Sequence, residues 1–325
     1  MSDAAPTKDA TPEHPIPNGL WRRLLLARFE QIKIGRFKVY EGKDLILDAG
    51  QAPDEEAVSI YIQSYNAYRA MGLGGALGAS EAYMDGDWRC DDLLEVLQLF
   101  VKNRGVVASM DAGLAKFQVP LRRFQHWLNR DTLVQSKRNI AAHYDLGNTF
   151  FEQFLDQTMT YSSGYFVDPQ QTMLEGSEQK LDLICKKMQL KSSDHILEIG
   201  TGWGGFALHA AKHYGCKVTT TTISPAQFEW AAERVLEAKL EDRIELLQLD
   251  YRRLEGRFDK IVSIEMIEAV GLKFLPLFFE TCAGLLRPGG SMLLQAITIA
   301  EQRFEAAKRS VDFIQRYIFP GGALA

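Results

Sequence analysis

Short apolar stretches alternate with amphipathic ones between residues 178 and 298, and this alternation restricts the fold more than any other feature of the sequence. The apolar stretches are brief and rich in β-branched residues, as in "KVTTTTIS" and "RIELLQLD", which predicts strands. The stretches between them have helical periodicity, and one begins with Ser224 and Pro225, residues preferred at a helix start. Five strands separated by helices predict a doubly wound parallel sheet, which binds ligands at the carboxyl ends of its strands.

A glycine-rich turn, "ILEIGTGWGG", follows the first of these strands and opens a helix. Its glycines are Gly200, Gly202 and Gly204. They allow a tight turn and a close approach of backbone N–H groups to a ligand, but dinucleotide enzymes have a similar turn. Three details favour S-adenosylmethionine over NAD. Trp203 would crowd a pyrophosphate, Glu198 is placed to hold an ammonium group, and Thr222 stands where an acid would bind the NAD ribose.

The remainder of the chain predicts a second domain, because 325 residues exceed one ordinary core. Residues 1–18 are polar and proline-rich and predict a disordered tail. Residues 19–130 mix strand-like and helical stretches, with a helix start at Asp91 and Asp92, and predict a small α+β domain and a helical connector.

The charge and the cysteine content restrict the kinds of binding partner and the cellular compartment that we expect. The net charge of −5 argues against nucleic acid, and four separated cysteines give no pattern for zinc or for a disulfide framework. No apolar run is long enough to cross a bilayer or to act as a signal peptide, so we expect a cytoplasmic protein. Residues 20–40 and 116–130 interleave basic side chains with Trp, Phe and Leu, which suits peripheral binding to an anionic inner membrane face. Helices with one solvated and one packed side remain the alternative.

Several motifs together carry a family resemblance. "LEIGTGWGGFA", "TISPAQ", "LDYRRL" and "RPGGSMLLQ" look like class I methyltransferase motifs. With "NIAAHYDLGNTFFEQFLDQTMTYSSGYF", "SEAYMDGDW" and "FIQRYIFPGG", nearly the whole chain after residue 20 resembles cyclopropane-fatty-acyl-phospholipid synthases and mycolic acid cyclopropane synthases. The resemblance implies an α/β fold: a Rossmann-like class I methyltransferase domain over residues 131–325 and a smaller N-terminal α+β domain associated with lipid. It also implies S-adenosylmethionine as cofactor, acyl chains of membrane phospholipids as substrate, and a homodimer, since family members commonly pair.

The same resemblance assigns residues to the cofactor. Tyr161 and Ser162 would contact its methionine part, and Gly200 and Gly202 would line the floor of the site. The adenosine would be surrounded by Thr222, Ile223 and Gln227, with Gln227 on the ribose, and by Asp250 and Tyr251 near the adenine.

The chemistry of the family requires a dry site and a base. Methyl transfer to an alkene leaves a carbocation, and loss of a proton from the added methyl closes a cyclopropane ring. In the family the base is a bound bicarbonate held by Cys, Glu and His. This sequence keeps the Glu as Glu268 but has Ser163 for the Cys and Gln295 for the His. These three residues are the catalytic candidates. Ser and Gln can still hydrogen-bond an anion, and a hydride shift giving a methyl- or methylene-branched chain remains the alternative to ring closure.

The end of the sequence carries one further expectation. A class I methyltransferase sheet normally has seven strands, whereas five are expected here, and the family continues past "YIFPGG". We therefore expect a truncated domain whose C-terminal strands are missing, with an inactive remnant as the alternative to an active enzyme.

Overall fold

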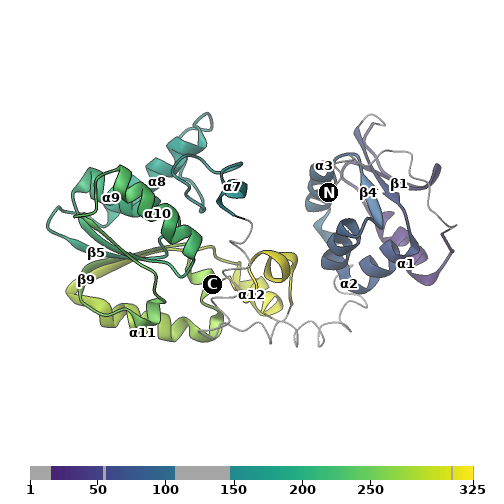
Figure 1. The fold of residues 1–325 in the computed structure, drawn as a ribbon. Coiled ribbons are helices and arrows are strands. Elements are labelled where there is room, and N and C mark those ends of the chain that lie inside the picture. The colour runs from purple at the N-terminus through teal and green to yellow at the C-terminus, as the bar shows by residue number, and fades with distance from the viewer. Residues whose placement is uncertain (1–15, 54–55, 107–146, 309, 325) are drawn as a thin grey trace. The chain divides into compact units, whose positions relative to one another are not determined.

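The structure is a computed structural model that describes residues 16–53, 56–106, 147–308 and 310–324. The chain divides into two compact units, residues 1–125 with 309–313 and residues 126–308 with 314–325 (Figure 1). Most of the expected tail, and the basic stretch at 116–130, lie outside the described residues. Within the described residues, no helix combines the length and the apolar character needed to span a bilayer.

The first unit is built on a four-stranded mixed sheet with the strand order β2-β1-β3-β4. Strand β1 pairs antiparallel with β2 and parallel with β3, and β3 pairs antiparallel with β4. The strands are β1 (Arg36–Glu41), β2 (Asp44–Gly50), β3 (Ala57–Ile62) and β4 (Trp88–Cys90), and the helices are α1 (Leu20–Phe29), α2 (Tyr65–Met84) and α3 (Leu93–Lys102). This unit is α+β, as the sequence predicts, and Asp92 caps α3 through a hydrogen bond from the Glu95 N–H.

The first basic stretch lies on α1 and β1 of this unit. Two of its arginines form ion pairs within the unit, Arg22 with Glu41 at 2.7 Å and Arg36 with Asp48 at 2.6 Å. The apolar side of α1 packs inward through Phe29, whose ring lies 5.3 Å from that of Phe37. These contacts give α1 and β1 a packed side and locally paired charges, and binding of this stretch to a membrane stays a prediction.

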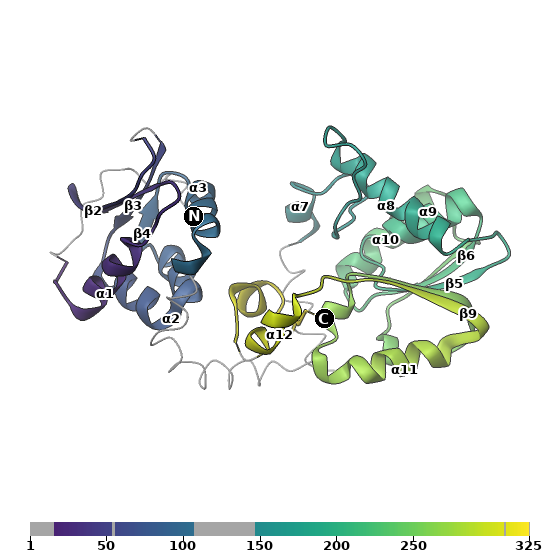
Figure 2. The ribbon, with the colours of Figure 1, turned by 180° about the vertical axis from the view of Figure 1, so that it is seen from behind.

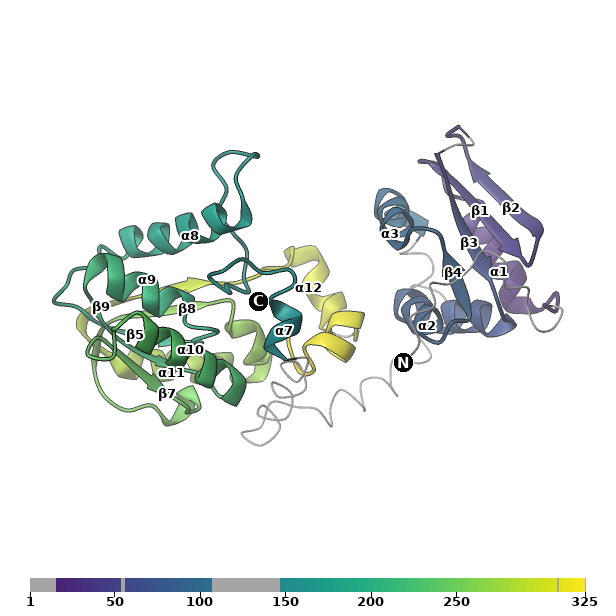
Figure 3. The same cartoon turned by 45° about the horizontal axis from the view of Figure 1, so that its top comes forward.

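The second unit contains the predicted doubly wound sheet. Its five strands are parallel and follow the order β7-β6-β5-β8-β9. They are β5 (His195–Ile199), β6 (Lys217–Thr221), β7 (Ile244–Leu247), β8 (Phe258–Ile264) and β9 (Leu286–Gln295). Helices α8 (Met173–Lys187), α9 (Gly205–Tyr214) and α10 (Pro225–Glu237) cover one face, and α11 (Leu275–Leu285) covers the other (Figures 2 and 3). The order reverses between β5 and β8, which is where such sheets bind ligands.

Side chains of this sheet alternate between two cores. Ile196 and Val262 enter the core that includes α8, α9 and α10, whereas Leu197 and Ile261 enter the core that includes α11. Burial on both faces explains why the strands read as nearly continuous apolar runs in the sequence.

Helix boundaries follow their capping residues. Helix α10 begins as predicted, with the Ser224 hydroxyl accepting from the Gln227 N–H and Pro225 in the first turn. Helix α8 begins at Met173, earlier than its apolar period suggests, because Thr172 and Glu175 form a capping box. The remaining short elements are α7 (Asn148–Phe151), η3 (Tyr251–Arg253), η4 (Ile267–Ala269), η5 (Leu272–Phe274), α12 (Glu301–Ala307) and the short π-helix η6 (Ile314–Ile318).

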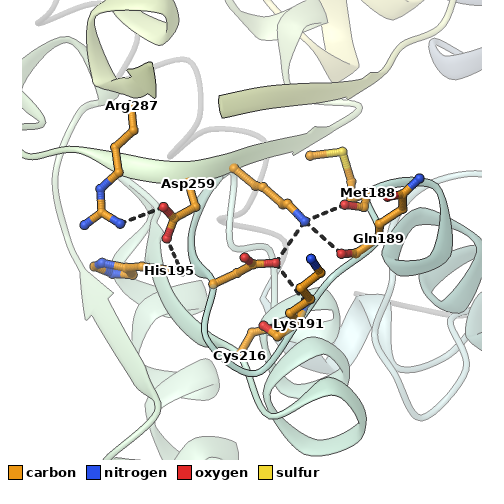
Figure 4. A network of polar contacts seen from close by, with 9 residues as sticks. Met188, Gln189, Lys191, His195, Cys216, Asp259 and Arg287 are labelled. Atoms are coloured by element: carbon orange, nitrogen blue, oxygen red, sulfur yellow. Dashed lines mark hydrogen bonds and ion pairs between the residues drawn. The ribbon is translucent and has the colours of Figure 1, made fainter. Parts of the chain in front are cut away.

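A polar network holds the amino ends of the strands together (Figure 4). Lys260 of β8 lies 2.8 Å from Asp194 and donates to the carbonyls of Met188 and Gln189 after α8. Asp259 accepts from the backbone N–H of His195 at 2.8 Å and from Arg287 at 2.6 Å. Ion pairs and hydrogen bonds thus join the amino ends of β5, β8 and β9.

Candidate functional site

The predicted site residues gather at the carboxyl edge of the five-stranded sheet. The glycine turn follows β5, Thr222 to Gln227 follow β6, Asp250 follows β7, Glu265 and Glu268 follow β8, and Gln295 ends β9. The stretch from Tyr161 to Ser163, distant in sequence, reaches the same edge through hydrogen bonds to the residues after β8 and β9.

The glycine turn has the backbone that its sequence predicts. Gly200, Gly202 and Gly204 all have positive φ values, of 104°, 53° and 88°, a conformation that favours glycine. The N–H groups of Gly200 and Thr201 donate to the Thr221 carbonyl and fasten the turn to β6. A Cβ at Gly202 would meet no atom within 4 Å, so the backbone there borders open space.

Glu198 lies one layer beneath this turn. Its side chain is buried, and it accepts a 2.6 Å hydrogen bond from the Thr220 hydroxyl, which also contacts the Thr201 hydroxyl at 2.7 Å. Burial raises the pKa of Glu198 to about 8, because the charged form loses its hydration. The carboxyl group is therefore mostly neutral at pH 7 unless a cation approaches it.

Trp203 connects the turn to α7. Its buried indole lies 4.9 Å from the Phe151 ring in a cluster that also contains Met159, and its N–H donates to the Asn148 side chain at 2.8 Å. The indole therefore packs against α7, and a contact of Trp203 with a cofactor would come from its backbone. Sequence reasoning did not give the direction of this ring.

The residues after β6 and β7 hold one another in fixed positions. The Thr222 hydroxyl donates to the side-chain oxygen of Gln227 at 2.9 Å, with both residues buried and Ile223 half-buried between them. Asp250 accepts two hydrogen bonds from the Arg252 guanidinium group, at 2.8 and 2.7 Å. The Tyr251 ring lies 5.4 Å from that of Phe278. Contacts of these five predicted residues with adenosine stay predictions.

A buried amine supports the stretch from Tyr161 to Ser163. Lys180 of α8 is only 4% exposed, and its ammonium group donates to the Ser162 hydroxyl. Burial lowers the pKa of Lys180 to about 8, against the opposing effect of the negative charges of Glu265 and Asp156. The Tyr161 ring packs 5.3 Å from that of Phe151. Sequence reasoning missed Lys180, although an amphipathic helix with a lysine on its apolar side was a detectable signal.

Ser163 and Gln295 meet at a third residue that the sequence analysis did not single out, Glu265. Its Oε1 atom accepts from the Ser163 N–H at 3.0 Å, from the Ser163 hydroxyl at 3.0 Å and from the Gln295 amide at 2.7 Å. The Gln295 amide also donates to the Ser163 hydroxyl at 3.1 Å. An acid directly after a buried strand of a doubly wound sheet was the signal available for Glu265.

Glu268, the remaining catalytic candidate, stands beside this cluster without a hydrogen bond to it. Its Oε1 accepts from the Ile297 N–H, and its Oε2 is buried with no hydrogen-bond partner among the described residues. Burial raises the pKa of Glu268, and the charge of Glu265 adds to the shift. The structure thus brings Ser163 and Gln295 together at Glu265 and places Glu268 beside them, and the catalytic roles of the three predicted residues stay predictions.

Comparisons with known proteins find proteins of similar sequence. The family profile described as mycolic acid cyclopropane synthetase matches residues 131–325. Tuberculostearic acid methyltransferase UfaA1 of Mycobacterium tuberculosis is 38% identical over 292 residues, covering 84% of this chain and 65% of that protein. Cyclopropane-fatty-acyl-phospholipid synthase of Escherichia coli K12 is 36% identical over 297 residues, covering 86% of this chain and 71% of that protein.

A solved structure supports the fold. The crystal structure of mycolic acid cyclopropane synthase CmaA1, complexed with SAH and CTAB, matches with a TM-score of 0.55 at 32% identity. The match covers 58% of this chain and 69% of that chain. The chain therefore spans about two thirds of the length of these relatives.

Proposed function

Because the chain belongs to the mycolic acid cyclopropane synthetase family, we propose that it transfers the methyl group of S-adenosylmethionine to the cis double bond of unsaturated acyl chains in phospholipids. The proposal rests on a single observation, which is the arrangement of residues at the carboxyl edge of the sheet. There a glycine turn bordering open space lies in the same unit as a hydrogen-bonded cluster of Ser163, Glu265 and Gln295.

The residues of the edge fit S-adenosylmethionine, which when bound supplies an electrophilic methyl group. Gly202 leaves room for a ligand above the turn, and Thr222 and Gln227 are fixed in place after β6. Glu198 is a buried carboxyl whose charged form an ammonium group would stabilise. An NAD ribose would instead need a free acid after β6, where Thr222 stands.

The residues do not fit a bound bicarbonate ion. The donors that the family resemblance assigns to such an anion, on Ser163 and Gln295, already serve the Glu265 carboxylate. A second anion there would face the Glu265 carboxylate at close range, and like charges in a partly buried site repel strongly.

The aromatic surroundings suit a cationic acyl chain. Tyr161 is flanked by the rings of Phe151 at 5.3 Å, Phe154 at 6.1 Å and Phe319 at 6.3 Å. Ring faces stabilise positive charge without offering a lone pair to trap it. Phe154 and Tyr161 are partly exposed, and we propose that the acyl chain enters from a membrane surface along this aromatic cluster. We further propose peripheral association with the cytoplasmic membrane face and assembly as a homodimer.

Two products can follow from the same transfer. The first candidate is a cyclopropane fatty acid, formed when the added methyl loses a proton and closes the ring. The second candidate is a methylene-branched chain, formed after a hydride shift. The departure of Ser163 and Gln295 from the Cys and His of the family resemblance favours the second candidate, and the kept Glu268 favours the first.

Incubation with S-adenosylmethionine and vesicles of a cis-unsaturated phospholipid, followed by mass spectrometry of the acyl chains, tests the function. We expect a mass gain of one CH2 unit in the acyl chain. Resistance of the product to hydrogenation at the former double bond indicates the cyclopropane, and a retained double bond indicates the branched chain. Binding of S-adenosylmethionine without any acyl mass gain would contradict the proposal, as would methylation of soluble acceptors alone.

A further inference from the structure

We propose that the Glu265 carboxylate, held by Ser163 and Gln295, is the base that removes the proton from the alkylated acyl chain, so that the reaction needs no separately bound anion. This inference rests on the proposed function. It concerns a residue that neither the sequence motifs nor the family resemblance singled out.

The backbone at Glu265 is strained. Its φ value is 47°, in the left-handed region that costs a residue with a side chain about 1 kcal/mol. Its N–H donates to the Gln295 carbonyl at 2.8 Å, which ties the strained turn to the end of β9. Strain of this kind persists where surrounding contacts hold it in place, and it collects at functional sites.

The carboxylate is held by hydrogen bonds. Three donors converge on Oε1, two from Ser163 and one from Gln295, at 2.7 to 3.0 Å. Three donors on one oxygen fix the position of the carboxyl group. In the part of the chain that the structure describes, no hydrogen bond is made to Oε2, which leaves that oxygen to take a proton.

The carboxylate also has charged neighbours. The Lys180 ammonium group, on the other side of Ser162, interacts favourably with the charge of Glu265. Glu268 interacts unfavourably, and burial with the charge of Glu265 raises the Glu268 pKa. The two adjacent acids therefore stand in different electrostatic surroundings. Pairs of carboxyl groups with such different surroundings typically divide acid and base roles.

The step balances without another reactant. The π electrons of the alkene form the new bond to the methyl carbon, and the sulfur keeps the electron pair of the bond that breaks. Glu265 then takes a proton from the added methyl, and the electron pair of that C–H bond closes the ring. After a hydride shift to the neighbouring cationic carbon, the same pair forms the C=CH2 double bond of a methylene branch instead. Because Ser163 is exposed at the rim of the cluster, the proton can return from Glu265 to water.

The test removes the carboxylate and offers a replacement. Glu265→Gly suits the left-handed backbone and leaves the three donors facing a space of carboxylate size. Glu265→Gln fills that space with a neutral amide, and Glu255→Gln, at an exposed acid after η3, is the matched control. Methyl transfer to phospholipid vesicles is measured in buffer freed of carbon dioxide, with and without added formate or bicarbonate. Calorimetry measures S-adenosylmethionine binding for each variant.

We expect both Glu265 variants to bind S-adenosylmethionine normally and to lose about 10²-fold or more in turnover, the usual contribution of a general base. Formate should restore turnover to Glu265→Gly but not to Glu265→Gln, and bicarbonate should not accelerate the unaltered protein. Full turnover by Glu265→Gln, failure of formate to rescue Glu265→Gly, or stimulation of the unaltered protein by bicarbonate would each overturn the inference.

A second measurement separates this inference from the proposed function. If the unaltered protein alkylates no phospholipid, the proposed function fails, and binding of ¹³C-formate by NMR still tests the donor cluster. Formate binding to Glu265→Gly but not to the unaltered protein supports the cluster as a carboxylate site. Equal binding to both, or to neither, contradicts it.

Discussion

Replacing the buried Lys180 by Met is expected to stabilise the protein at neutral pH. Lys180 is almost fully buried on α8, and burial lowers the pKa of its ammonium group to about 8. An unfolded lysine has a pKa of about 10.4, so holding the charged amine inside the fold costs about 3 kcal/mol. Loss of the hydrogen bond to Ser162 offsets about 1 kcal/mol of this. The net expectation for Lys180→Met at pH 7 is a gain of about 2 kcal/mol in the free energy of unfolding.

The pH dependence gives the sign of the effect. Below pH 8 the folded and unfolded lysines are both charged, and the whole cost is present. Between pH 8 and about 10.4 the unfolded chain binds the extra proton, so the unaltered protein becomes more stable as pH rises. The advantage of Lys180→Met should therefore shrink through this window. Above this window the variant should be the less stable protein, because the loss of the hydrogen bond to Ser162 is then the only remaining difference.

Urea unfolding of both proteins at pH 7 and pH 10 measures this difference. The shift in the transition midpoint gives the change in the free energy of unfolding, provided that the slope of the transition stays constant. Lys187→Met, at an exposed position of the same helix, is the matched control and should show no such pH dependence. A Lys180→Met variant that is less stable than the unaltered protein at pH 7 would refute the reasoning. The stabilised variant should also transfer methyl groups more slowly, because the cation beside the Glu265 carboxylate is gone.

The remaining predictions concern the turn, the amino edge and the buried acid. Gly200→Ala should destabilise the protein by about 2 kcal/mol, because its Cβ would lie 3.1 Å from Met266 at a φ value of 104°. Gly202→Ala, whose Cβ meets no protein atom, should fold but lose S-adenosylmethionine affinity in calorimetry. Lys260→Met should lower the free energy of unfolding by about 2 kcal/mol in urea titrations, since Asp194 and two carbonyls lose their partner. Glu198→Gln should gain stability relative to the unaltered protein as pH rises from 5 to 8. Burial raises the Glu198 pKa to about 8, so in this window the carboxyl ionises in the unfolded chain but stays protonated in the folded one, which destabilises the unaltered protein.

Local signals in the sequence were sufficient to predict the sheet and the edge of the sheet at which it binds a ligand. β-Branched runs gave the strands, and Ser224 with Pro225 gave the start of α10, because both signals depend on neighbours in the chain. The positive φ values of Gly200 and Gly202 were predictable for the same reason. The carboxyl edge then followed from the topology of parallel strands.

The contacts inside the site were not predictable in this way. Glu265 lies 102 residues from Ser163 and 30 from Gln295, so their shared hydrogen bonds exist only after the strands are in register. The buried position of Lys180 depends on which side of α8 faces the sheet near Ser162. The direction of the Trp203 indole depends on α7, which packs against the turn from an earlier part of the chain. Each of these is a tertiary contact with no local signature.

Backbone strain separates functional from structural positions in the described residues. Four residues other than glycine have positive φ values: Met159, Gln189, Lys239 and Glu265. Gln189 and Lys239 directly follow the ends of α8 and α10, where a left-handed residue satisfies the last carbonyls of a helix. Met159 and Glu265 end no helix, so helix capping does not account for their strain. Met159 precedes Tyr161 in the chain, and Glu265 accepts a hydrogen bond from Ser163, so both strained residues adjoin the same stretch. Strain at Glu265 that no helix end explains agrees with a carboxylate held in a fixed position for the reaction.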